Sequence, residues 1–150
     1  MSWIAKLTPP LLYQSCIVAM LVFHFLLPYR QVVMAPYRYG GIILFLGGAG
    51  FAIWAKRIFK QSGIPIRPSQ APVRVYTEGP FRLSRNPMYL GISIGLLGIA
   101  VILGSLVTFV FPVVFAAVMN FVYIPFEERM LESALPTDYR RYKERVRRWL

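Results

Sequence analysis

Charged residues are scarce in this chain. Only 15% of its 150 residues are charged, whereas a soluble domain of ordinary composition has about 25%. Hydrophobic residues make up 57% of the chain, and several long stretches contain no charge at all. This composition excludes an ordinary water-soluble domain and indicates that lipid is the solvent for much of the chain.

Acidic residues are the rarest of the charged ones. Six Asp and Glu stand against 17 Lys and Arg, which gives a formal net charge of +11 at pH 7. The positive charges flank apolar runs, as is typical of the positive-inside bias and of attraction to anionic membrane lipids. Because no base-stacking motif accompanies these charges, we expect no nucleic-acid partner.

Cysteine is almost absent. The single cysteine, Cys16, lies in an apolar run without a second metal ligand, so we expect neither an intramolecular disulfide nor a metal site. No cleavable signal peptide is expected either. Lys6 precedes an apolar run, but no small-residue cleavage site follows that run.

Long apolar runs predict the fold. The third of these runs, residues 88–126, contains no charge over 39 positions and is too long for a single span of about 20 residues. A turn at Gly104 and Ser105 would divide it into a helical hairpin. The sequence therefore predicts an all-α integral membrane protein with about four transmembrane helices in a single membrane domain, residues 1–150. The expected spans are residues 11–27, 40–55, 88–103 and 106–126.

Small residues lie where neighbouring spans would pack. They are Gly47, Gly48 and Gly50 in the second span and Gly91, Gly95 and Gly98 in the third. They suit close packing within one chain or between chains, so the oligomeric state stays open. No strand precedes the first group, which is therefore not a dinucleotide-binding fingerprint. His24 in the first span is expected to pack as a hydrogen-bonded side chain.

The distribution of positive charge predicts the topology. Seven Lys and Arg lie in the loop 56–87 and seven in the tail 127–150, but only Arg30 and Arg38 lie between the first two spans. The positive-inside rule then places the loop, the tail and both termini in the cytoplasm. All six acidic residues lie in the same two segments, so polar chemistry is expected there. So short a chain suggests a prokaryotic plasma (inner) membrane.

Two arginines lie just before the third expected span. Arg82 and Arg85 precede Pro87, which occupies the first-turn position that proline favours. The free N–H groups of such a turn form a weak anion site. Ser84 or Asn86 could cap the helix, and arginines anchored to lipid phosphates would explain the same residues without any site.

Two carboxylates, Glu127 and Glu128, follow the last span directly. A solvated helix end would explain them, and so would a site. The segment 127–150 that they open predicts a basic amphipathic helix lying along the membrane surface. Its apolar positions, three and four residues apart, are Tyr139, Tyr142, Val146 and Trp149.

From residue 64 to residue 150 the chain resembles the isoprenylcysteine carboxyl methyltransferase and phospholipid methyltransferase superfamily. The resemblance is carried by residues 79–91, by the two glutamates with Leu131, and by Tyr139, Tyr142 and Val146. Members are multi-span helical membrane proteins that transfer a methyl group from S-adenosylmethionine. The chain departs from the family at Asn86, where histidine is frequent, and at residues 135–136, where the family tends to have Phe-Gly.

The resemblance implies a cytoplasmic cofactor pocket, and our hypothesis assigns roles to its residues. Arg85, with Arg82, would pair with the carboxylate of S-adenosylmethionine. Glu127 or Glu128 would bind its ribose hydroxyls or amino group, or take a proton from an amine acceptor. The pocket would also include Asn86 and Pro87 of the Arg-x-Pro segment and the rings of Tyr89, Tyr139 and Tyr142. The methyl acceptor would be a lipophilic or amphiphilic molecule, such as a phospholipid amine or an isoprenoid acid.

Two other functions remain open at this point. Membrane sterol and isoprenoid reductases are similar in their C-terminal helical regions and use NADPH, although 150 residues leave little room for that larger cofactor. A non-catalytic membrane protein could hold anionic lipid or a partner through its basic tail.

Overall fold

The computed structural model describes residues 8–27, 30–61 and 74–150. Within these ranges the chain is helical, with no strand and a single isolated bridge between Gln31 and Ser105. The predicted all-α class is confirmed. Lys6 and the proline-rich segment 64–68, with Arg67, lie outside the described residues.

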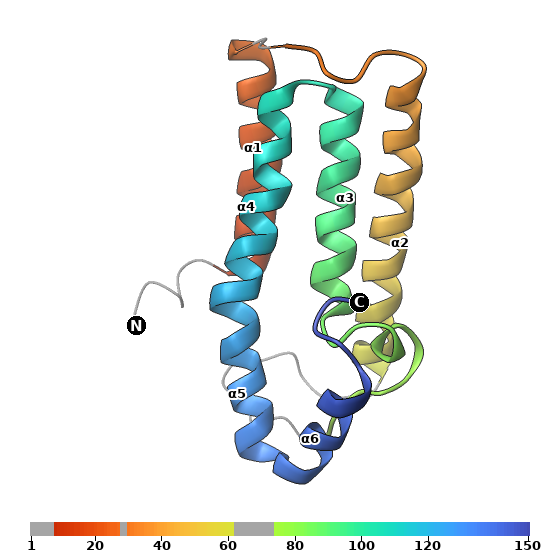
Figure 1. The fold of residues 1–150 in the computed structure, drawn as a ribbon, viewed down its shortest axis with the longest axis vertical. Helices are drawn as coiled ribbons and strands as arrows, with labels where there is room; N and C mark the ends of the chain where they lie inside the picture. The colour runs from red at the N-terminus through yellow and green to blue at the C-terminus, as the bar shows by residue number, and fades with distance from the viewer. Residues whose placement is uncertain (1–7, 28–29, 62–73) are drawn as a thin grey trace.

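Helices α1 to α5 run along the length of a bundle, and α6 lies at its lower end (Figure 1). In chain order they are α1 (Pro9–Leu26), α2 (Gly40–Gln61), α3 (Pro87–Leu103), α4 (Val110–Val118), α5 (Ile124–Ala134) and α6 (Pro136–Arg145). Short 3-10 turns are η1 (Tyr37–Tyr39), η2 (Gly79–Arg82) and η3 (Leu106–Phe109), and a π turn, η4 (Met119–Tyr123), joins α4 to α5.

Three of the described helices are long and apolar enough to cross a membrane. They comprise Pro9–Leu26, Tyr37–Gln61 and Leu106–Ala134, and α3 is a shorter apolar helix beside them. Many large apolar side chains on the outside of the bundle are exposed, among them Ile43, Val113 and Phe121. The chain is therefore an integral membrane protein whose outer surface suits lipid.

The two ends of the bundle differ. At one end lie the α3–α4 hairpin and the connection from α1 to α2, and at the other lie η2, α5 and α6 (Figure 1). We call the second the pocket end. At the hairpin end the expected turn is present, with Gly104 in the left-handed conformation at φ +72°. The Ser105 hydroxyl lies 2.6 Å from His24 Nδ1, so the prediction that His24 is hydrogen-bonded is confirmed.

Glycine brings α2 and α3 into backbone contact. A Cβ placed on Gly48 would lie 2.5 Å from both the carbonyl oxygen of Gly91 and the amide nitrogen of Gly95. The close packing predicted for Gly48, Gly91, Gly95 and Gly98 is confirmed. Within the chain it is wrong for Gly47 and Gly50, which have no atom within 4 Å of the Cβ position.

The last transmembrane helix continues beyond its expected end. Residues Leu106–Ala134 form one apolar helix, so Glu127 and Glu128 lie inside it and not at its end. Its π turn ends two residues before Pro125. Proline lacks an N–H and crowds the carbonyl four residues earlier, and the wider π turn accommodates both effects. Likewise, α2 continues to Gln61, so the expected loop 56–87 begins as helix.

The predicted single helix over residues 127–150 is wrong. Pro136 ends α5 and starts α6, because the residue before a proline is disfavoured in the helical conformation, and Leu135 has φ −137° and ψ 60°. Helix α6 ends at Arg145, and Val146 is extended. Tyr139 and Tyr142 are buried within the protein and do not face the membrane surface.

Candidate functional site

A cavity of about 150 Å³ lies at the pocket end, between η2, the start of α3, α5 and α6. All of the predicted site residues except Arg82 line it. They are Arg85, Asn86, Pro87, Tyr89, Glu127, Glu128, Tyr139 and Tyr142. Arg82 is exposed on η2 and lies outside the lining.

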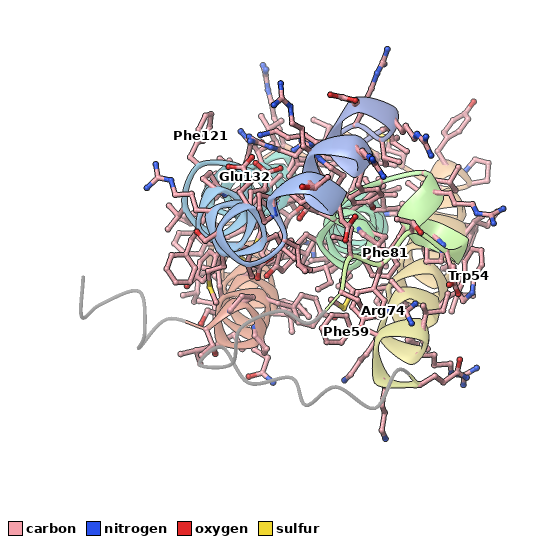
Figure 2. All side chains as sticks on the ribbon, turned by 90° about the horizontal axis from the view of Figure 1, so that it is seen from below. Trp54, Phe59, Arg74, Phe81, Phe121 and Glu132 are labelled. Carbon is pink, nitrogen blue, oxygen red and sulfur yellow. The ribbon has the colours of Figure 1, made fainter. Side chains whose placement is uncertain are left out.

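Aromatic residues that the sequence analysis did not single out form one wall of the cavity. The ring centroid of Tyr76 lies 4.8 Å from that of Phe59 and 5.6 Å from that of Phe81. Viewed along the bundle axis, Phe59, Arg74 and Phe81 lie on the same side of the pocket end, beside α2 (Figure 2). The Arg74 guanidinium covers the Tyr76 ring at 5.1 Å and pairs with Glu78 at 3.3 Å. This side of the pocket is thus lined mainly by aromatic rings, with the Arg74 guanidinium over one of them.

A buried carboxylate, Glu128, lies between two arginines. Arg85 Nη2 lies 3.0 Å from Glu128 Oε1, and Arg148 Nη2 lies 2.7 Å from Glu128 Oε2. The side chains of Arg85 and Glu128 are each only 8% exposed, whereas that of Arg148 is 35% exposed. The buried Nε of Arg85 has no hydrogen-bond partner among the described residues. The cluster therefore combines two positive charges with one negative charge and leaves a donor free beside the cavity.

Its neighbour Glu127 has a different environment. Consecutive residues of an α-helix point about 100° apart, so the two carboxylates diverge. Glu127 Oε1 accepts a 2.6 Å hydrogen bond from the Tyr89 hydroxyl of α3. Among the described residues no Lys, Arg or His forms an ion pair with Glu127. Within the described part of the chain, the site therefore holds one carboxylate paired with arginines and one that is hydrogen-bonded to a tyrosine and has no ion pair.

The α6 tyrosines close the pocket. The Tyr142 hydroxyl donates to the Phe81 carbonyl at 2.6 Å and lies 3.3 Å from the Ser84 carbonyl. Burial raises the pKa of Tyr142 to about 12, although the nearby Arg85 acts in the opposite direction. Burial and the neighbouring Glu128 carboxylate raise the pKa of Tyr139 as well. Both phenols therefore remain protonated at neutral pH, and Tyr142 ties α6 to η2.

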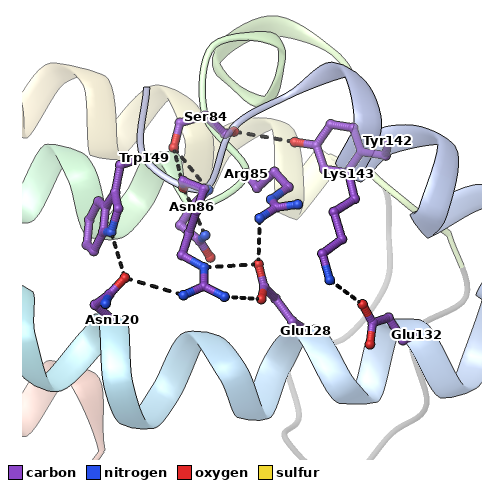
Figure 3. A network of polar contacts seen from close by, with 10 residues as sticks. Ser84, Arg85, Asn86, Asn120, Glu128, Glu132, Tyr142, Lys143 and Trp149 are labelled. Atoms are coloured by element: carbon purple, nitrogen blue, oxygen red, sulfur yellow. Dashed lines mark hydrogen bonds and ion pairs between the residues drawn. The ribbon is translucent and has the colours of Figure 1, made fainter.

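Ser84 and Asn86, which precede α3, are held by the backbone of Arg148, a residue that the sequence did not place at the site. Asn86 is the N-cap residue of α3, but its side chain does not cap the helix. Its Nδ2 instead donates to the Arg148 carbonyl at 3.1 Å, and the Ser84 hydroxyl donates to the same oxygen at 3.2 Å (Figure 3). Sequence reasoning missed Arg148, Asn120 and Trp149, which meet beside this segment.

No group of three or more His, Cys, Asp or Glu that could hold a metal ion is found among residues 8–27, 30–61 and 74–150. The described residues of the site offer two carboxylates, the guanidinium groups of Arg74, Arg85 and Arg148, tyrosine hydroxyls and aromatic rings.

Comparison with known proteins adds an independent finding. The sequence model of the family described as phospholipid methyltransferase matches residues 37–138. An uncharacterized protein of Haemophilus influenzae is 41% identical over 63 residues, which cover 42% of this chain and 100% of that protein. No solved structure matches the chain.

Proposed function

The chain belongs to the phospholipid methyltransferase family, whose model matches more than half of its length, and from that premise we propose a specific reaction for it. The protein transfers a methyl group from S-adenosylmethionine to a lipophilic or amphiphilic acceptor. The pocket between η2, α3, α5 and α6 is the site of this transfer. Its end of the bundle faces the cytoplasm.

The free Nε–H of Arg85 is the observation that carries this proposal. An unpaired donor on a side chain that is only 8% exposed is costly, because buried charged groups need partners. The Arg85–Glu128–Arg148 cluster has an excess of positive charge, which an anionic group would balance. S-Adenosylmethionine carries a carboxylate, and a guanidinium binds a carboxylate through two parallel hydrogen bonds. The residues present therefore fit this cofactor.

The remaining residues of the pocket suit the other parts of the molecule. Aromatic faces at Phe59, Tyr76 and Phe81 suit the adenine ring, and the ring of Tyr89 lies next to Glu127 in the lining. Cations are attracted to aromatic faces and carboxylates, so Tyr89 and Glu127 suit the sulfonium end. When bound, S-adenosylmethionine supplies an electrophilic methyl group on a positively charged sulfur.

The chain's contribution to methyl transfer is then positioning and proton handling. In-line displacement requires the acceptor atom, the methyl group and the sulfur to be aligned, and fixed side chains supply that order in advance. Glu127 is the carboxylate that could accept a proton from an amine acceptor, because Glu128 is held by two arginines. A carboxylate acceptor would need no base.

The surroundings of the pocket support an amphiphilic acceptor. On the outside of α2 and α5, close to the pocket in sequence, Trp54 and Phe126 are 48% and 40% exposed. Exposed Lys56, Arg57 and Lys60 follow directly on α2. A molecule with an apolar chain and a polar head could therefore keep its chain in lipid while its head enters the site. The same cluster of cations supports the cytoplasmic assignment of this end.

Equilibrium binding of S-adenosylmethionine and NADPH to the detergent-purified protein tests the proposal. We expect selective binding of S-adenosylmethionine. Arg85→Ala should weaken it by about tenfold or more, since hydrogen bonds to charged groups contribute roughly 1.5–3 kcal/mol. Arg141→Ala is the matched control, because Arg141 is exposed on α6 and forms no ion pair with a described residue.

Each other outcome contradicts the proposal in its own way. Selective binding of NADPH would indicate a reductase. Failure of the folded protein to bind either compound would favour a non-catalytic membrane protein. Equal weakening by Arg85→Ala and Arg141→Ala would remove the specific role of Arg85.

A further inference from the structure

Residues 147–149, which follow α6, run back across the polar side of the site, and we call them the strap. The Arg85 N–H donates to the Arg147 carbonyl at 3.0 Å. The Arg148 carbonyl accepts from the Ser84 hydroxyl and from Asn86 Nδ2 at 3.2 and 3.1 Å. The strap therefore binds each of the three residues that precede α3, and Figure 3 shows its contacts with Ser84 and Asn86.

The strap is also anchored inside the bundle. Trp149 Nε1 donates to Asn120 Oδ1 at 3.0 Å, and Trp149 packs against the main apolar core. Asn120 lies in the π turn η4, and π turns occur often at functional sites. Arg148 Nη1 lies 3.5 Å from the same Asn120 oxygen. The backbone and side-chain contacts together fix the position of the Arg148 guanidinium.

The Arg148 guanidinium limits how many oxygens of Glu128 are available to Arg85. Arg148 holds Glu128 Oε2 at 2.7 Å and approaches Oε1 with its Nε at 3.4 Å. Arg85 consequently receives only Oε1, through Nη2 at 3.0 Å, and its own Nε stays free. Without Arg148, both carboxylate oxygens could turn to Arg85 in the forked arrangement that carboxylates and guanidinium groups favour.

We propose that Arg148 is a positioning residue that keeps Arg85 available for the carboxylate of the cofactor. It does so by occupying Glu128 from the outer side of the site. The inference rests on the proposed function and adds to it a residue from the strap. It also gives Asn86 a role that needs only a hydrogen-bond donor, since the Asn86 amide holds the backbone of Arg148 in place.

A purely structural role for the strap would have a different consequence. If removal of Arg148 only loosened the pocket, all nucleoside ligands would bind more weakly to a similar degree. If it made Arg85 unavailable as a carboxylate partner, only ligands that carry the carboxylate would bind more weakly. Decarboxylated S-adenosylmethionine separates the two, because it keeps the adenosine, the sulfonium and the amine and lacks the carboxylate.

The experiment measures dissociation constants of both ligands for the wild type, Arg148→Ala, Arg148→Lys and Arg145→Ala, with thermal unfolding recorded for each. We expect Arg148→Ala to raise the dissociation constant of S-adenosylmethionine by about tenfold, as for partners within one charged network. The dissociation constant of the decarboxylated ligand should stay within about twofold of the wild-type value. Arg148→Lys should be intermediate, since lysine keeps the charge without the forked geometry. Arg145, exposed three residues earlier, is the charge-matched control and should change neither constant.

A second comparison tests whether Arg148 acts through Glu128. In a Glu128→Gln background the additional loss caused by Arg148→Ala should largely disappear, because the two residues form one network. Full additivity would overturn the inference.

The outcomes for the inference and for the proposed function are distinguishable. If Arg85→Ala weakens the binding of S-adenosylmethionine and Arg148→Ala does not, only the role of Arg148 is overturned. If Arg148→Ala weakens the binding of both ligands equally, the strap has a purely structural role. Failure of the wild type to prefer the carboxylate-bearing ligand would overturn the inference and the carboxylate role of Arg85, and failure to bind either ligand would overturn the proposed function as well.

Discussion

The Tyr89 hydroxyl on α3 donates a 2.6 Å hydrogen bond to Glu127 on α5, across 38 positions of sequence. The next residue, Glu128, turns instead to Arg85 and Arg148. Neighbouring carboxylates on one helix thus have separate partners and, in our account, separate tasks. We propose that Glu128 orients the two arginines and that Glu127 takes part in the transfer step.

The first prediction concerns Glu127. If the acceptor is an amine, Glu127→Gln should lower kcat by about 100-fold or more, in keeping with loss of a general base. The dissociation constant of S-adenosylmethionine should rise by less than in Arg85→Ala, because Arg85 remains in place and only the attraction of Glu127 for the sulfonium is lost. Single-turnover methyl transfer with saturating cofactor provides the measurement.

Tyr89→Phe is the companion variant. It removes the hydrogen bond and keeps the carboxylate, so the loss of kcat should be smaller than in Glu127→Gln. Unchanged turnover in Glu127→Gln with an amine acceptor would contradict the assignment of Glu127 as the base.

A second prediction tests the contact of α2 with α3. A Cβ on Gly48 would lie 2.5 Å from backbone atoms of α3, which cannot move aside as a flexible side chain could. Gly48→Ala should therefore destabilise the bundle by about 1–3 kcal/mol, as overpacking does. Gly47→Ala is the control one position away, with open space at its Cβ, and it should be neutral or slightly stabilising. Unfolding of the two variants in the same detergent, with equal midpoints, would contradict the backbone contact.

The third prediction concerns Tyr142, which ties α6 to η2. Tyr142→Phe leaves the Phe81 carbonyl without its 2.6 Å donor and should cost about 1–2 kcal/mol of unfolding free energy. The pKa of Tyr142 is raised from 10 to about 12 in the folded protein, so the protonated phenol is the form that folding favours. Its contribution should be constant below pH 10 and decline as the pH rises from 10 towards 12.

Unfolding measured at several pH values checks this sign. Tyr39→Phe is the control, because Tyr39 is 67% exposed at the opposite end of the bundle. A difference between wild type and Tyr142→Phe that grew above pH 10 would contradict the account.

The fourth prediction concerns the hydrogen bond between Ser105 and His24 at the hairpin end. Ser105→Ala removes the partner of His24 and should lower stability by about 0.6 kcal/mol, the usual scale for a hydrogen bond between membrane helices. Because Ser105 lies at the end of the bundle opposite to the pocket, cofactor affinity should stay unchanged (Figure 1). A large loss of cofactor affinity in a folded Ser105→Ala protein would contradict this prediction, because it would show that the hairpin end is coupled to the pocket.

The sequence predicted the helices well because lipid allows few alternatives. A run such as 88–126 must form hydrogen bonds within itself, and Gly104 supplies the left-handed turn between its two helices. The tail was harder to predict. The spacing of Tyr139 and Tyr142 identifies one apolar helix face but does not say whether lipid or protein covers it. Pro136 was the available signal for the break between α5 and α6.

The residues of the candidate pocket came from the family resemblance, and the strap did not. Arg148 is one of many arginines in a basic tail, and nothing in its spacing distinguishes it from exposed Arg147. Asn120 offered more, since it is an amide within an otherwise apolar run, and polar residues inside membrane helices usually have partners. Its partner, Trp149, could not be identified without the backbone path of the strap.

The central claim is that the pocket end transfers methyl groups from S-adenosylmethionine, and its most direct test follows the methyl group itself. Protein reconstituted in vesicles of total bacterial lipid would be given methyl-labelled S-adenosylmethionine, and label in the extracted lipid would be measured. We predict labelled lipid product with the wild type and with Arg141→Ala, and little or none with Arg85→Ala. Absence of labelled product with folded wild-type protein, or equal labelling by wild type and Arg85→Ala, would contradict the claim.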